Sequence, residues 1–126
     1  MKLIQNVDAP IFELPGVPGL HVTGLASPQR GAAETCVWKL RLSSGAPAVP
    51  HSVTREEIFV GLKGQARATV EGVERMLGPG DALVVPAHRR FSLEPVSAEP
   101  FEALVVLPVG GQAVTESGQF TPPWAE

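Results

Sequence analysis

Apolar and polar side chains alternate over residues 35–42 of the chain. Trp38 and Leu40 fall on one face of an extended segment, whereas Lys39 and Arg41 fall on the other. Successive side chains of a strand point to opposite sides of its sheet, so this period of two predicts a strand that is buried on one face.

Short apolar runs separated by turn residues fill most of the remaining sequence. Glycine and proline interrupt the chain about every eight to twelve residues, as at Pro15-Gly16 and at Gly78-Pro79-Gly80. No segment shows the three–four spacing of an amphipathic helix. We therefore expect an all-β sandwich or barrel. Outside 35–42, the expected strands are 11–14, 20–25, 57–62, 65–70, 73–77, 82–85, 91–93 and 101–107.

Composition supports this expectation and excludes several classes of protein. The 126 residues include 13 Gly and 13 Pro, which is too many helix breakers for a helical bundle. Hydrophobic residues make up 44% of the chain, enough to build a core rather than a disordered segment. The net charge is −3 and the Lys and Arg residues are scattered, so we expect neither a nucleic acid nor a membrane as partner.

Cysteine usage points to a reducing compartment. Cys36 is the single cysteine, so no disulfide can form within the chain. The first residues turn polar too early for a signal peptide, and the longest apolar stretches, 82–85 and 103–107, are too short to span a bilayer. We therefore expect a cytoplasmic protein, with Cys36 as a small buried side chain.

Two segments have a distinctive spacing of glycine, proline, histidine and glutamate. The first is Gly45-x5-His51-x-Val53-x3-Glu57-x6-Gly64, and the second is Gly80-x5-Pro86-x-His88-x2-Phe91. Together they resemble the paired motifs of the cupin superfamily over about residues 45–95. The resemblance implies a single-domain cupin-type jelly-roll β-barrel over residues 1–126, with its motif-bearing core at about 35–108.

The resemblance also implies where a metal ion would bind. Cupins usually hold one divalent ion on a His-x-His pair, a Glu and a more distant His. Alternate residues of a strand face the same side, so two such histidines can point at one ion. In this chain, His51 and Glu57 match the motif, but Val53 and Phe91 stand where the other two histidines would be.

The substitutions at these positions predict a degenerate metal site. Valine and phenylalanine cannot coordinate a metal, so we expect no tightly bound cofactor. His88 is the one side chain that could complete a site with His51 and Glu57 for Zn, Fe, Mn or Ni. His51 and Glu57 are also the candidate catalytic residues, and burial of Glu57 among apolar neighbours would raise its pKa.

Inward-facing apolar residues predict a binding cavity for a small molecule. Val53, Phe59 and Phe91 share inward-facing positions with His51 and Glu57, either by motif position or by strand alternation. Alternation from Phe91 also places Arg89 on the inner face, where it could pair with an acidic ligand. The candidate ligand-binding residues are Val53, Phe59, Arg89 and Phe91.

Three functions remain open from the sequence. The leading hypothesis is a small-molecule-binding cupin-like protein with a degenerate metal site. The first alternative is a metal-dependent enzyme of dioxygenase or isomerase type that uses His51, Glu57 and His88. The second is a non-catalytic structural or regulatory dimer. The resemblance implies a homodimer. We expect the N-terminal and C-terminal segments at its interface, because the Pro-rich termini and the apolar tail at Phe120 and Trp124 have little local partner.

Overall fold

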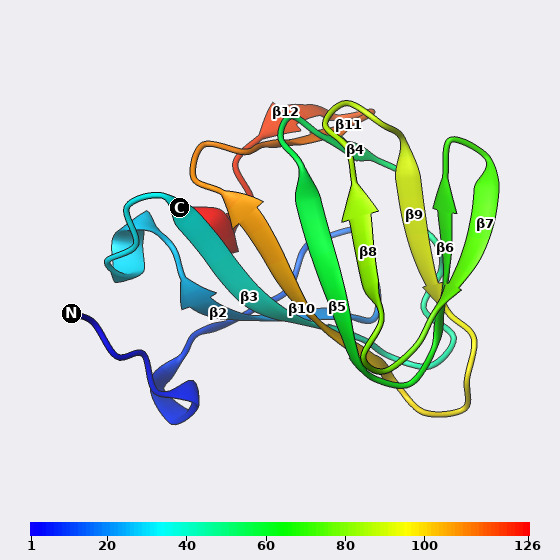
Figure 1. Cartoon of the computed structure of the whole chain (residues 1–126), viewed down its shortest axis with the longest axis horizontal. Coiled ribbons are helices and arrows are strands. Elements are labelled where there is room, and N and C mark those ends of the chain that lie inside the picture. Colours follow the sequence, from blue (N-terminus) through cyan, green and yellow to red (C-terminus); the bar gives the residue numbers. More distant parts are fainter.

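The computed structural model describes all residues 1–126 and is built almost entirely from antiparallel strands (Figure 1). Its largest sheet has six strands in the order β1-β2-β3-β10-β5-β8. This result confirms the all-β jelly-roll fold expected from the sequence. The strands of this sheet are β1 (Ile11–Phe12), β2 (Leu20–Ala26), β3 (Thr35–Leu42), β5 (Glu57–Lys63), β8 (Ala82–Val85) and β10 (Phe101–Pro108).

Two three-stranded sheets, β12-β11-β4 and β7-β6-β9, form the opposite layer. An isolated antiparallel bridge joins them, because His51 and Phe91 exchange backbone hydrogen bonds of 3.0 and 2.8 Å. Two residues of the motif segments therefore meet at the seam of this layer. Its strands are β4 (Ser52–Val53), β6 (Ala66–Val70), β7 (Val73–Leu77), β9 (Phe91–Pro95), β11 (Ala113–Thr115) and β12 (Gly118–Phe120).

The core lies on the inner face of the large sheet. Trp38 and Leu40 of β3 are buried, as the alternation predicts, while Arg41 is exposed. Strand β10 alternates in the same way, and its buried Val105 pairs in register with Trp38. Cys36 is fully buried at the start of this face, and burial raises the pKa of its thiol.

The motif glycine Gly64 shows why the chain needs glycine at one turn. It follows β5 with φ of 71°, a left-handed conformation that side chains disfavour. A Cβ atom there would also lie only 2.4 Å from the carbonyl oxygen of Pro100. The glycine thus permits a close backbone approach between the end of β5 and the segment before β10.

The C-terminal tail packs against its own chain. The short helix η3 (Pro123–Ala125) lies against β2 and β3, and the buried Trp124 ring lies 6.1 Å from Trp38 and 6.3 Å from Phe12. Arg30 of η2 (Pro28–Arg30) donates a 2.8 Å hydrogen bond to the Trp124 carbonyl oxygen. The tail thus finds its partners within its own fold, at residues that are distant in the sequence.

The remaining short helix, η1 (Asn6–Asp8), precedes β1 in an N-terminal segment that projects from the body of the molecule in Figure 1. None of the helices is both long and apolar enough to cross a bilayer.

Candidate functional site

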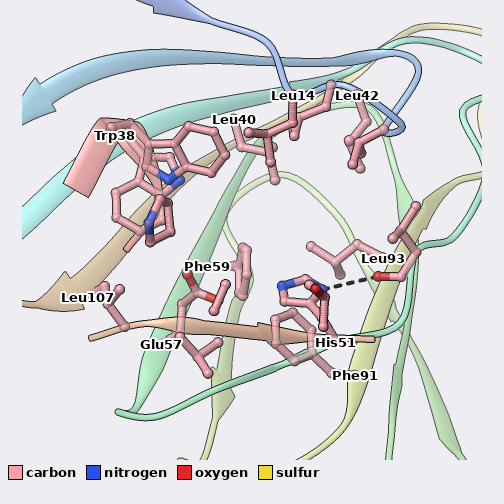
Figure 2. Close-up of a pocket in the computed structure, with 18 of the residues that line it drawn as sticks. Leu14, Trp38, Leu40, Leu42, His51, Glu57, Phe59, Phe91, Leu93 and Leu107 are labelled. Carbon is pink, nitrogen blue, oxygen red and sulfur yellow. Dashed lines mark hydrogen bonds between the residues drawn. The ribbon is translucent and has the colours of Figure 1, made fainter. Parts of the chain in front are cut away.

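A cavity of about 150 Å³ lies between the two layers (Figure 2). Fifteen of the 20 residues that line it are hydrophobic, and no lysine or arginine is among them. The cavity is therefore an apolar space with few polar groups. Its principal lining residues are Leu14, Trp38, Leu40, Leu42, His51, Val53, Glu57, Phe59, Phe91, Leu93, Leu107, Phe120 and Trp124.

The structure brings together five of the residues singled out from the sequence. Glu57 and Phe59 point inward from β5, two residues apart on the same face. Val53 lines the cavity from β4, while His51 and Phe91 line it from the bridge between the two smaller sheets. In Figure 2 the labelled side chains of Glu57 and His51 lie across the cavity from Leu14, Leu40 and Leu42.

Glu57 is a buried carboxyl group in apolar surroundings. Its exposed fraction is 6%, and removal from water raises its pKa from the ordinary 4.5 to about 8. Neither carboxyl oxygen has a hydrogen-bond partner in the protein, and neither is sealed off by packing, so both are open to the cavity. Glu57 is thus predominantly protonated at pH 7 and can donate a hydrogen bond.

His51 is held in one tautomer by the backbone. Its Nδ1 lies 3.1 Å from the carbonyl oxygen of Val49, and because a carbonyl only accepts, Nδ1 must carry the proton. Burial lowers the pKa of His51, and the nearby charge of Arg90 lowers it further against the opposing effect of the Val49 hydrogen bond. Neutral His51 therefore presents the lone pair of Nε2, which no protein group uses.

Three aromatic rings form one wall of the cavity. The His51 ring lies 4.5 Å from the Phe91 ring, and Phe91 lies 5.7 Å from Phe59 in an edge-to-face arrangement. Phe91 thus occupies a motif position with an apolar ring that packs against the imidazole.

His88 and Arg89 do not take part in this cavity. Both are exposed, and His88 lies in a turn with φ of 64°, its backbone N–H bonded to the Val53 carbonyl oxygen at 2.7 Å. The prediction that Arg89 shares the inner face with Phe91 is wrong, because β9 begins only at Phe91 and the turn before it breaks the alternation. His88 instead borders a separate polar hollow with Glu71 and Arg90.

The side chains present do not fit a divalent metal ion. No group of three or more His, Cys, Asp or Glu side chains is close enough together to hold one. Val53 and Phe91, buried to 3% and 2% exposure, fill positions beside His51 and Glu57 with groups that have no donor atom.

Part of the cavity wall was missed by the sequence analysis. Leu40 and Leu42 share the face of Trp38, so the alternation of β3 was a signal that could have identified them. Phe120 and Trp124 come from a tail without periodicity, and no sequence signal placed them here. The tail therefore closes the cavity on the side of Trp38.

A comparison with protein families identifies the same fold as the structure. A family model described as a cupin domain matches residues 38–107, more than half of the chain. The chain belongs to the cupin family. No curated protein matches the sequence.

Solved structures share the fold at low sequence identity. The polyketide cyclase RemF from Streptomyces resistomycificus is 21% identical, with a TM-score of 0.75 over 86% of this chain and 79% of that one. An RmlC-like cupin from Shewanella frigidimarina is 18% identical, with a TM-score of 0.72 over 86% and 90%. A sugar phosphate isomerase of the cupin superfamily from Silicibacter pomeroyi is 19% identical, with a TM-score of 0.69 over 95% and 90%. These similarities establish the fold alone.

Proposed function

We propose that this protein binds a small, largely apolar molecule in the cavity between its layers, without a tightly bound metal ion. The observation that carries the proposal is the cavity of about 150 Å³, lined mostly by hydrophobic side chains. A space of roughly this size accepts a benzene-sized ring. A few polar groups in an apolar wall are the usual composition of a small-molecule site.

The degenerate metal site is part of this proposal. A firmly held divalent ion needs three or four converging donors, whereas this cavity offers only His51 and Glu57. The alternative of a dioxygenase or isomerase that uses His88 as third ligand loses support, because His88 is exposed and borders the other hollow. The cyclase and isomerase activities named for the structural relatives stay with those proteins.

Toluene binding followed by NMR tests the proposed function. We expect saturable shifts of resonances from His51 and Phe91, which line the cavity. Leu93→Trp should abolish the shifts by filling the space, whereas Ser92→Trp should not, since Ser92 is the neighbouring residue of β9 and is not among the lining residues. Toluene shifts that persist unchanged in Leu93→Trp would reject the cavity as the binding site.

We also propose a homodimer that uses the outer face of the large sheet. Ile58 pairs in register with Val84 and Val106, and Val60 pairs with Leu104, so apolar side chains form a continuous patch across three strands. Val84 is 51% exposed, and no helix covers these strands in Figure 1. A second copy would shield this patch from water, and a typical interface buries about 1,600 Å² in total.

Sedimentation equilibrium tests the dimer. Val60→Glu should convert a micromolar dimer into a monomer, because it places a charge at the centre of the patch. Val73→Glu is the control, since Val73 is also a valine and is 51% exposed, but it lies on β7, in the other layer. A wild-type monomer, or loss of the dimer only in the control, would reject this interface.

A cytoplasmic location is the last part of the proposal. Its support is Cys36, which is the single cysteine, is buried, and makes a 3.7 Å contact with the Ala125 carbonyl oxygen rather than a disulfide. Fractionation of the cells that produce the protein would test the location directly.

A further inference from the structure

Two polar groups that line the cavity, the Glu57 carboxyl and Nε2 of His51, have no hydrogen-bond partner in the protein. Glu57 is more than nine-tenths buried, yet both its oxygens lack hydrogen bonds and open on the cavity. Burying a polar group without a partner is unfavourable, so such groups normally find one in the protein, in water or in a ligand. A ligand that fills the cavity displaces water and must therefore supply the missing partner.

His51 and Glu57 require different hydrogen-bonding groups on a ligand. The backbone carbonyl of Val49 takes the Nδ1 proton of His51, which leaves Nε2 as an acceptor. An isolated carboxylate is strongly disfavoured in apolar surroundings, so Glu57 is protonated and acts as a donor. His51 and Glu57 thus offer a ligand one acceptor and one donor, both uncharged.

The wall provides no charge to balance an ionised ligand. None of the lining residues is a lysine or an arginine, and Arg89 and Arg90 are exposed outside the cavity. A carboxylate or phosphate placed here would lose its water and gain no cation. Anionic ligands are therefore excluded by the same residues that make the cavity apolar.

We propose that the ligand is a neutral, ring-sized molecule that carries a carbonyl-type acceptor for Glu57 and a hydroxyl-type donor for Nε2 of His51. This inference rests on the proposed function and narrows it to a chemical class. It excludes pure hydrocarbons as the best ligands and excludes organic acids altogether.

Four probes of similar size test the inference on the wild-type protein by calorimetry at pH 6.5: toluene, benzaldehyde, phenol and benzoate. In a purely apolar cavity, benzaldehyde and phenol would bind more weakly than toluene, because their polar groups lose water. With partners present, we expect both to bind about 3- to 10-fold more tightly than toluene, the effect of one net hydrogen bond. Benzoate should show no measurable binding.

Two variants assign the partners. Glu57→Leu should reverse the order of two probes, so that benzaldehyde binds more weakly than toluene. His51→Phe should remove the advantage of phenol and preserve that of benzaldehyde. Glu56→Leu is the matched control, because Glu56 is the exposed neighbour of Glu57, and it should leave the order of all four probes unchanged.

The outcomes separate this inference from the proposed function. If toluene binds and the polar probes bind more weakly, or if benzoate binds as well as benzaldehyde, the inference is overturned while the apolar cavity stands. If no probe binds, toluene included, the proposed function itself fails. Retention of the wild-type probe order in Glu57→Leu would also overturn the assigned role of Glu57.

Discussion

The two motif segments reach the same cavity but contribute opposite chemistry to it. Residues 51–57 supply His51 and Glu57, the polar groups that face inward, whereas residues 86–91 supply only the Phe91 ring. The polar side chains of the second segment, His88, Arg89 and Arg90, are all exposed, and His88 lies in a tight turn before β9.

This difference explains why a family that often binds metal ions can include a cavity unsuited to one. Metal binding needs three or four converging donors, whereas here the second motif segment contributes only an aromatic ring. The donors that remain are neutralised by their apolar surroundings, and the same change that removes the metal site suits the cavity to an uncharged ligand.

Restoring the missing donors should give the largest effect. Val53→His combined with Phe91→His places imidazoles beside His51 and Glu57, so we expect stoichiometric zinc after dialysis, compared with substoichiometric zinc in the wild type. Elemental analysis of protein purified without a nickel column measures this. Adding His88→Ala to the double variant should leave the zinc content unchanged. Tightly bound zinc in the wild type would contradict the conclusion that the second motif segment contributes no metal ligand.

Removing the buried carboxyl should stabilise the protein above neutral pH. Because the pKa of Glu57 is about 8 in the folded chain and 4.5 ordinarily, the folded state binds its proton more tightly. The stability contributed by that proton is complete below about pH 4.5 and is lost as the pH rises through about 8. Glu57→Leu should therefore unfold at a higher denaturant concentration. We expect the free energy of unfolding to rise by roughly 3–5 kcal/mol at pH 9 and by far less at pH 4.5.

Urea unfolding at pH 4.5, 7 and 9 provides the measurement for this prediction. Glu56→Leu, which changes an exposed glutamate, should show no such dependence on pH. Equal gains from Glu57→Leu at all three values would mean that Glu57 is ionised in the folded protein.

Truncating the Phe91 ring of the second segment should lower the free energy of unfolding by a clearly measurable amount. Phe91→Ala removes a side chain that is 2% exposed and contacts both His51 and Phe59. We expect a loss of about 3–5 kcal/mol in the free energy of unfolding, the usual effect of emptying a buried aromatic position. Arg90→Ala, at an exposed neighbour, is the control and should stay within about 0.5 kcal/mol.

The outward side chains of the second segment should matter least. His88→Ala and Arg89→Ala should change toluene affinity by less than about twofold, because neither side chain lines the cavity. Titration of the two variants alongside the wild type provides the measurement. A tenfold loss in Arg89→Ala would restore the inward register predicted from sequence alternation.

The sequence predicted the strongly patterned parts of the fold and failed where pattern was absent. The strand over residues 35–42 was correctly bounded, because each inward position is apolar and each outward one tolerates water. The inward placement of Phe59 followed from its spacing to Glu57 on one strand. Arg89 was misplaced, because alternation was extended through a turn whose positive φ at His88 cannot be read from residue types alone.

The C-terminal tail illustrates a second limit of sequence reasoning. Strands β11 and β12 have three residues each, too few to show a period of two. Trp124 is held by contacts with Trp38 and Arg30, which lie far away in the chain. Such long-range packing is set by the completed fold rather than by any local signal, so its contribution to the cavity was not foreseeable.

The most direct test of the account is the dissociation constant of toluene measured twice, on protein stripped of metal with a chelator and on the same protein resupplied with zinc. Because apolar side chains make up most of the cavity wall, we predict the same value in both samples. Binding that appears only after zinc is added would contradict the central claim that this cavity takes its ligand without a metal ion.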